Sequence, residues 1–222
     1  HASVDRDLRA HSQLVLLNVA EGLNLADFTL KRARQEWVAT KKLRTHKDFV
    51  ADFPNFKDLI VQVAVIDEEG YLAASSLNPE PQRVYLGDRE HFQKHIAARS
   101  DQIFVSRPIV GRVSGRTTIQ LTRPIFDAAA VFSGVMVVSL DPEYLIRKNF
   151  KVLATAGIQS VLMGNDGHLR VQLPADTVDR LVQTEQGPDG HMQRVHLTGS
   201  LLSNSYIWQE RALDDFNLVY AV

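Results

Sequence analysis

Apolar residues recur at mixed three- and four-residue steps through the first part of the chain, from Val4 to Trp37. This spacing is typical of an α-helix with an apolar side, and Gly22 in its interior costs only about 1 kcal/mol. A helix over residues 1–45 would be roughly 60 Å long, more than a globular domain needs. We therefore expect a long helix that packs along both units described below. It could also form a dimer seam in its N-terminal part and continue from a membrane helix.

Residues 46–145 alternate between turn signals and apolar strands. We expect a short helix broken at Pro54, then a β-hairpin, and then a helix that Asp88 caps. The first strand of the hairpin is predicted at residues 60–66, and the second begins at residue 71. The capped helix is predicted at 89–99, and the later strands at 102–106, 117–126 and 131–140.

A smaller unit is expected from near Phe150, after a new helix that starts at Asp141 and Pro142. Its predicted elements are a hairpin within 158–172, a helix over 173–183 and strands near 191–199, 204–212 and 216–222. The predicted fold class is therefore α+β. A long N-terminal helix (1–45) is followed by two modules (46–145 and 146–222), each an antiparallel sheet with flanking helices.

Composition narrows the functional classes. The 222 residues include 25 Lys and Arg against 26 Asp and Glu, so no basic field is available for non-specific binding of nucleic acid. No apolar run reaches the roughly 18 residues that a membrane span requires. The chain has no Cys, which excludes thiolate metal sites, Cys nucleophiles and disulfides.

Motifs for catalysis are absent from the sequence: it has no nucleophile elbow, zinc-protease helix, P-loop or dinucleotide fingerprint. His91 and His95 lie at i and i+4, a spacing that suits a metal pair but is common by chance. His168, His191 and His196 are scattered. We expect no catalytic residues, no metal and no cofactor in this chain, with a metal-dependent hydrolase as a distant alternative.

The order of several short motifs carries a family resemblance. V-x-V-I-D-E-E-G-Y (63–71) is followed by L-G-D-R-E-H-F (86–92), S-R-P-I-V-G-R-x-S-G-R (106–116), L-T-R-P-I-F-D (121–127) and F-S-G-V-M-V-V-S-L-D-P (132–142). Together they resemble the double Cache (PDC, PAS-like) extracytoplasmic sensor domains of bacterial membrane receptors. Those on GGDEF diguanylate cyclases and sensor histidine kinases are the most similar. The resemblance covers about residues 1–222 and is strongest over 60–146.

The resemblance implies a membrane-distal module at 46–145 that holds the ligand and a membrane-proximal module at 146–222. It implies transmembrane helices before and after this chain, an effector domain in the cytoplasm, and a periplasmic location for this part of an inner-membrane protein. A homodimer is expected in the full-length receptor. His1 is not an initiator Met, and we read the chain as an excised fragment.

In the amino-acid-binding members of that family, an Arg at the position of Arg89 takes the ligand carboxylate, whose two oxygens its forked guanidinium matches. The alternative is an ion pair with Asp88 or Glu90. The resemblance places His91 at an aromatic ligand contact and Phe92 at the next ring, although Phe92 also suits the core.

The same members hold the ligand ammonium with a Tyr and two Asp. This chain has Ile109, Gly111 and Ser139 at those places. The carboxylates that would neutralise an amine are thus missing, and we expect a small anionic ligand, such as a mono- or dicarboxylate.

Polar side chains on the predicted strand 117–126 could complete the site. Thr118, Gln120 and Thr122 share one face of this strand, opposite Ile119, Leu121 and Arg123. Two interpretations of the Thr-Gln-Thr face remain open, a solvated surface and the floor of a ligand pocket.

Other candidates lie near turns. Arg107 and Arg123 each precede a proline and are held extended. If buried, they need a counter-ion, either Asp127 or a ligand anion. Tyr85 lies before the capped helix and could close over a pocket. Arg112 and Arg116 flank Gly-rich loop sequence and are expected to be exposed.

The function predicted from these features is that of an extracytoplasmic small-molecule sensor of a transmembrane signalling protein, with a diguanylate cyclase as its first expected output. The alternatives are the ectodomain of a histidine kinase or chemoreceptor, or a dimerisation or partner-sensing ectodomain without a small-molecule ligand.

Overall fold

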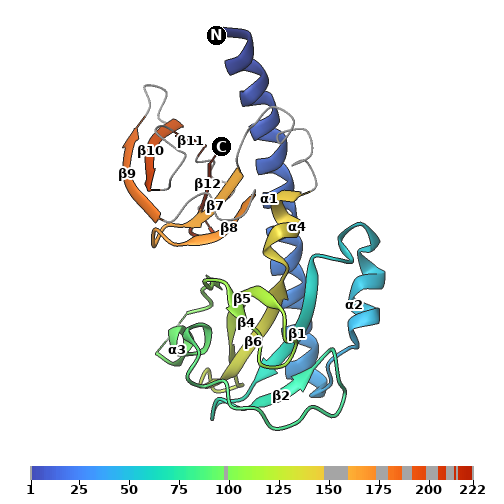
Figure 1. Ribbon diagram of the computed structural model, residues 1–222. Helices are drawn as coiled ribbons and strands as arrows, with labels where there is room; N and C mark the ends of the chain where they lie inside the picture. The colour runs from blue at the N-terminus through green and yellow to red at the C-terminus, as the bar shows by residue number, and fades with distance from the viewer. Residues whose placement is uncertain are drawn as a thin grey trace. The chain divides into compact units, whose positions relative to one another are not determined.

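Figure 1 shows the protein as a computed structural model, which describes residues 2–97, 100–147, 160–173, 180–186, 192–198, 205–208, 213 and 215–221. The chain forms two compact units, one of residues 23–141 and one of residues 1–22 with 142–222. The helix α1 (Ala2–Thr40) contributes residues to both. It ends at Thr40, before the expected residue 45, because Lys41 adopts a left-handed conformation (φ 55°) that stops a right-handed helix.

The unit of residues 23–141 is built on an antiparallel sheet of strand order β2-β1-β6-β5-β3, in which β4 also pairs with β5. Its strands are β1 (Ile60–Ile66), β2 (Leu72–Ser75), β3 (Phe104–Val105), β4 (Ile109–Val110), β5 (Thr117–Phe126) and β6 (Phe132–Leu140). The unit also has the helices α2 (His46–Asp52) and α3 (Glu90–Ile96) and the short 3-10 helix η1 (Pro54–Phe56). The predicted hairpin, the central strands and the break at Pro54 are confirmed.

The start of α3 differs from the prediction. Its N-cap is Arg89, whose side chain makes no capping hydrogen bond, so the prediction of Asp88 as the cap is wrong. The carboxylate of Asp88 binds Arg112 instead. The helix also ends at Ile96, short of the predicted residue 99.

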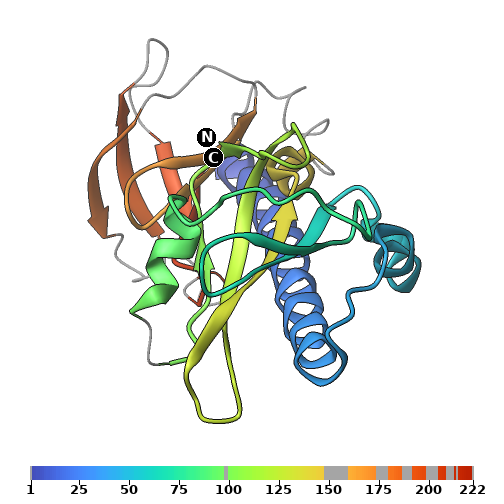
Figure 2. The ribbon, with the colours of Figure 1, turned by 90° about the horizontal axis from the view of Figure 1, so that it is seen from below.

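Side-chain alternation along β5 turns its two faces toward different helices. Arg123, on the face of Ile119 and Leu121, bonds to Asp27 of α1. Thr122, on the opposite face with Gln120, contacts His95 of α3 at 2.9 Å between Oγ1 and Nε2. The helices α1 and α3 therefore lie on opposite sides of the sheet (Figures 1 and 2).

The second unit has the helix α4 (Pro142–Arg147) and an antiparallel sheet of order β8-β7-β12-β11-β10-β9. Its strands are β7 (Ser160–Gly164), β8 (Leu169–Leu173), β9 (Arg180–Gln186), β10 (Met192–Thr198), β11 (Ser205–Trp208) and β12 (Leu218–Ala221). The hairpin and the last three strands are confirmed. The predicted helix 173–183 is wrong where it meets β9: the β-branched Val182 and Thr184 belong to a strand paired with β10. Residues 174–179 lie outside the described part.

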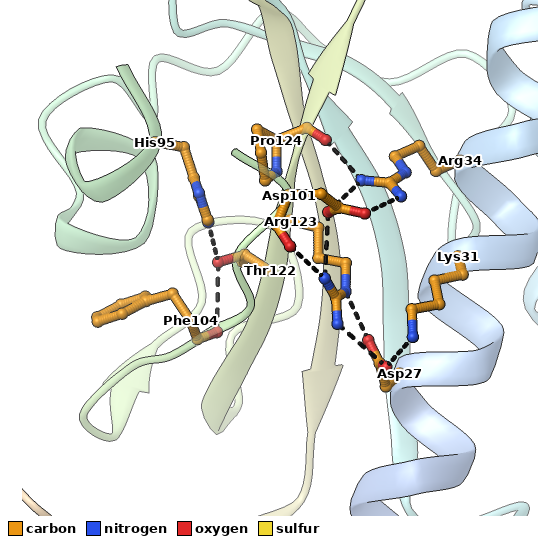
Figure 3. A network of polar contacts seen from close by, with 9 residues as sticks. All are labelled: Asp27, Lys31, Arg34, His95, Asp101, Phe104, Thr122, Arg123 and Pro124. Atoms are coloured by element: carbon orange, nitrogen blue, oxygen red, sulfur yellow. Dashed lines mark hydrogen bonds and ion pairs between the residues drawn. The ribbon is translucent and has the colours of Figure 1, made fainter. Parts of the chain in front are cut away.

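A network of ion pairs joins α1 to the sheet within residues 23–141 (Figure 3). The guanidinium of Arg123 bonds to Asp27 of α1 at 2.7 Å and to Asp101 at 3.1 Å. Arg34 of α1 binds both carboxylate oxygens of Asp101, at 2.6 and 2.7 Å, and Lys31 binds Asp27 at 2.7 Å. The hydrogen bond from Arg34 lowers the pKa of Asp101 to about 2, and Arg123 adds to this effect.

This network answers the question of which group neutralises Arg123. Its side chain is only 11% exposed, and a buried guanidinium needs a counter-ion. The sequence suggested Asp127 or a ligand anion, whereas Asp27 and Asp101 fill this role. Asp127 is committed to its own turn, where Oδ1 accepts the backbone N–H of Ala129 and of Val131 at 2.8 and 2.9 Å.

Within the part of the chain that the structure describes, no helix combines the length and the apolar character that a membrane crossing requires.

We expect Asp27→Asn to lower the free energy of unfolding of this unit by about 1–3 kcal/mol, because it leaves the buried guanidinium of Arg123 with a single carboxylate. Trp37 of α1 and Trp208 are the two tryptophans of the chain. In a Trp208→Phe background, urea denaturation followed by tryptophan fluorescence therefore reports on the unit that holds α1 residues 23–40.

The matched control is Glu69→Gln, which removes half of an ion pair with Arg83 whose two side chains are each 68% exposed. Exposed pairs contribute about 1 kcal/mol or less. An effect of Asp27→Asn no larger than that of Glu69→Gln would mean that the network does not hold α1 on the sheet.

Candidate functional site

The segment that leads into α3 is fixed by the turn between β1 and β2. The backbone N–H of Leu86 donates to the carbonyl of Gly70 at 2.8 Å, and Leu72 donates to Val84 at 2.9 Å. Gly70 has a φ of 89°, and a Cβ there would lie 2.6 Å from the Cα of Gly87. The turn therefore requires glycine, and the close approach sets where α3 begins.

The hairpin of β4 and β5 reaches the same segment from the other side. Ile109 pairs with Thr118, and the connecting turn places Arg112 at its tip. The guanidinium of Arg112 binds both carboxylate oxygens of Asp88 at 2.7 Å and the carbonyl of Tyr85 at 2.6 Å. The hairpin tip and the segment before α3 are thus tied together over one face of the sheet.

A cavity of about 410 Å³, a volume that includes the open space at its entrance, lies between these elements and the sheet. Its polar lining residues are Gln62, Arg89, His91, Arg112, Gln120 and Ser139. Its apolar walls come mainly from Ala64, Ile66, Leu72, Leu86, Val113 and Val137.

The charge in this cavity is positive. Arg89 is half-buried, and its guanidinium donates a long hydrogen bond, 3.5 Å from Nη2 to the carbonyl of Val110. No carboxylate among the described residues forms an ion pair with Arg89, and none lines the cavity. Arg112 is neutralised by Asp88, and its hydrogen bond lowers the pKa of that carboxyl. Arg89 is therefore the cation through which an anion would be held.

His91 and His95 are both buried residues of α3, but their side chains contact different parts of the unit. Burial lowers the pKa of His91 to about 4, and the nearby Arg89 adds to the shift. Burial also lowers the pKa of His95 to about 4. Both rings are therefore neutral at pH 7. His91 lines the cavity, whereas His95 bonds to Thr122 of the sheet. The described residues contain no cluster of three or more metal-ligating side chains.

The floor of the cavity is a buried polar network. Ser139 donates to Oε1 of Gln120 at 2.6 Å, and Nε2 of Gln120 donates to Thr118 at 2.7 Å. On β1, Gln62 donates to Ser75 at 2.9 Å. Thr118, Gln120 and Thr122 are all buried, so the interpretation of this face as a solvated surface is wrong.

The structure brings some of the predicted site residues together at the cavity and places others elsewhere. Arg89, His91 and Gln120 line it, and Thr118 supports Gln120 from behind. Phe92 is buried in the apolar cluster that includes Ala64, Ile66 and Val137.

The remaining candidates do not line the cavity. Tyr85 is 48% exposed and packs against Tyr71, with ring centroids 5.1 Å apart. Arg107 is exposed. Arg123 lies on the face toward α1, and Asp127 lies in the turn between β5 and β6.

Among the polar lining residues, Gln62 and Arg112 were not predicted as site residues, and Ser139 was noted only for not being acidic. Gln62 carries a readable signal, since it is a lone amide in the buried strand IVQVAVI. Arg112 is exposed as predicted, yet it lines the cavity. Its partner Asp88 is 24 residues away, which local sequence does not reveal.

No protein-family model and no curated protein matches the sequence. Solved structures with the same fold do exist. The extracellular domain of the putative histidine kinase rpHK1S-Z16 is 17% identical with a TM-score of 0.69, over 100% of this chain and 95% of that chain. The ligand-binding domain of the Pseudomonas aeruginosa chemoreceptor PctB with L-Arg is 12% identical with a TM-score of 0.66, over 100% and 94%. That of Pseudomonas fluorescens CtaA with L-serine is 15% identical with a TM-score of 0.63, over 99% and 96%.

These comparisons show that the chain shares the fold of extracellular sensor and ligand-binding domains of membrane receptors. The structures that share it are sensor or ligand-binding domains of kinases and chemoreceptors, not catalytic domains.

We expect the stability of the unit to fall as the pH drops from 6.5 to 4. In the unfolded chain a His takes up its proton near pH 6.5, whereas His91 and His95 stay neutral in the fold until about pH 4. The unfolded state thus binds more protons in this window, and stability that is complete above pH 6.5 is lost on acidification.

His91→Gln and His95→Gln should each remove on the order of 2 kcal/mol of the difference in free energy of unfolding between pH 7 and about pH 4.5. Urea titrations at the two pH values measure this. His168→Gln, at a side chain that is 44% exposed, serves as the control. A pH dependence unchanged in both α3 variants would contradict the burial of neutral rings.

Proposed function

We propose that the chain is the extracytoplasmic sensor domain of a transmembrane signalling protein, and that the unit of residues 23–141 binds a small carboxylate in its cavity. The observation that carries this proposal is Arg89, a cavity-lining cation with no ion-pair partner among the described carboxylates. The shared fold of ligand-binding receptor domains supports it. In this proposal residues 46–145 form the membrane-distal PAS-like module and 146–222 the membrane-proximal one.

The ligand class follows from the charges at the cavity. PctB and CtaA were solved with the amino acids L-Arg and L-serine. Here Ile109, Gly111 and Ser139, at the places where the amino-acid-binding relatives put ammonium ligands, all line the cavity, and none is acidic. An ammonium group beside Arg89 would gain no counter-charge, while a carboxylate would gain one.

The signal is proposed to travel from α3 to α1. His91 of α3 lines the cavity, and Asp101, a few residues beyond α3, is bound by Arg34 of α1. A ligand that draws α3 toward the sheet would therefore pull on α1 through this ion pair. It can shift the output only by its difference in affinity for the two states. The output is a histidine kinase, a chemoreceptor or a diguanylate cyclase, and the structural neighbours favour the first two.

We also propose that two copies associate through α1. In the N-terminal part of this helix, where the sequence predicted a dimer seam, the large apolar residues Leu14 and Leu17 are 54% and 59% exposed. Exposed apolar residues on a long helix suit a helix–helix seam. Should no ligand be found, this seam supports the alternative of a dimerisation or partner-sensing ectodomain.

Arg89→Ala is expected to weaken carboxylate binding by about 10–150-fold, because a charge-assisted hydrogen bond contributes about 1.5–3 kcal/mol. A thermal-shift screen against small carboxylates identifies the probe, since a ligand at 100 times its Kd stabilises the fold by about 2.7 kcal/mol. Calorimetric titration then compares the variants. Arg83→Ala, which removes an exposed guanidinium away from the cavity, is the control. Retained affinity in Arg89→Ala would refute the site.

Leu17→Glu should shift self-association of the chain to higher protein concentration, because it places a charge on the exposed side of α1. Sedimentation velocity over a concentration series measures this. Val131→Glu, at a residue that is 59% exposed in the turn between β5 and β6, should leave association unchanged. A monomer at all concentrations, or equal behaviour of the two variants, would speak against the seam.

A further inference from the structure

The charged groups that line the cavity are more exposed to solvent than the uncharged polar groups. Arg112 is exposed and Arg89 half-buried, whereas Gln62, His91, Gln120 and Ser139 are each 5% exposed or less. The positive charge therefore lies on the more exposed side, and the deeper part offers only uncharged hydrogen-bonding groups. A ligand whose carboxylate is at Arg89 extends its other end toward these groups.

The deep groups retain hydrogen-bonding capacity after their bonds within the protein are counted. The amide nitrogen of Gln120 has two N–H donors, and one of them goes to Thr118. Oε1 of Gln62 accepts no hydrogen bond from any described residue, although its amide nitrogen donates to Ser75. The floor thus presents at least one donor and one acceptor that the fold itself does not use.

His91 adds to this unused capacity. Its ring is 5% exposed and lines the cavity, yet neither ring nitrogen has a hydrogen-bond partner among the described residues. Since the ring is neutral at pH 7, one nitrogen can donate and the other can accept.

We infer that the cavity selects small carboxylates whose far end carries an uncharged hydrogen-bonding group, such as a hydroxyl, an oxo group or an amide. This inference rests on the proposed function and adds the identity of the second group. A hydroxyl or carbonyl oxygen can satisfy His91, Gln62 or Gln120 without bringing a second charge into the buried part of the site.

Each competing ligand leaves something unsatisfied. An ammonium would be buried without a lining carboxylate, and a second carboxylate would be buried beside neutral groups, both of which are unfavourable. A plain alkyl end would leave buried donors and acceptors unpaired, and sites built for hydrogen bonding discriminate strongly against such analogues. The preferred class is thus hydroxy, oxo or amide acids over amino acids, dicarboxylates and simple fatty acids.

The test is a calorimetric series with probes of matched length. Each probe carries its second group at the end opposite the carboxylate. The three-carbon set is propionate, 3-hydroxypropionate, 3-aminopropionate and malonate, and the four-carbon set is butyrate, 4-hydroxybutyrate, 4-oxobutyrate, 4-aminobutyrate and succinate. In at least one set, the hydroxy or oxo acid should bind ten times more tightly, or better, than the plain, amino and dicarboxylic acids. If the plain acid, the amino acid or the dicarboxylic acid binds as tightly as the hydroxy or oxo acid, this inference is wrong, but the proposed carboxylate site is retained. If no carboxylate binds, the proposed function fails.

Variants of the floor locate the selectivity. His91→Phe and Gln120→Leu should bring the ratio between the hydroxy and plain acids close to one, with little loss for the plain acid. Gln120→Glu keeps the shape of the side chain and should shift preference toward the amino acid of the set. Circular dichroism and melting curves establish which variants fold. If the affinity ratio between the hydroxy and plain acids is undiminished in every folded variant, the residues of the cavity floor do not determine ligand selectivity. That result would overturn the inference.

Discussion

The alternation of side chains along β5 is the constraint on which the rest of the unit of residues 23–141 depends. It sends Arg123 to one face of the sheet, where Asp27 and Asp101 neutralise it. It sends Gln120 to the other face, where the cavity lies. A slip of one residue would exchange these faces, burying Arg123 beside the cavity and an amide against α1. The structural ion pairs and the candidate site are therefore consequences of one strand register.

Local sequence patterns predicted the elements of this fold that depend on side-chain alternation within one strand. The alternation over 60–66 and 117–126 correctly predicted β1 and β5 and the division of β5 into a polar and an apolar face. Partners distant in sequence were not predictable. Arg123 is 96 residues from its partner Asp27. Asp88 binds Arg112, 24 residues away, and does not cap α3 as expected. The predicted helix over 173–183 failed because pairing with β10 decides the conformation of β9.

The candidate site shows the same division. Family resemblance and the period of β5 pointed to Arg89, His91 and Gln120, which line the cavity. Tyr85 and Arg107 do not, because the position of a loop side chain depends on what packs against it. The resemblance also singled out Ile109, Gly111 and Ser139 as neutral residues at the places where amino-acid-binding members carry ammonium ligands. The structure adds that these three residues line one cavity.

The central claim is that Arg89 lines a cavity and that no carboxylate in the described part of the chain neutralises it. A crystal structure of the chain soaked in bromide tests this without knowledge of the natural ligand, because the anomalous signal of bromide locates anions directly. The account predicts a bromide peak inside the cavity within hydrogen-bonding reach of the Arg89 guanidinium, and its loss in Arg89→Ala. A cavity that excludes bromide but takes up rubidium, or an Arg89 side chain found paired to an acid of the protein, would contradict it.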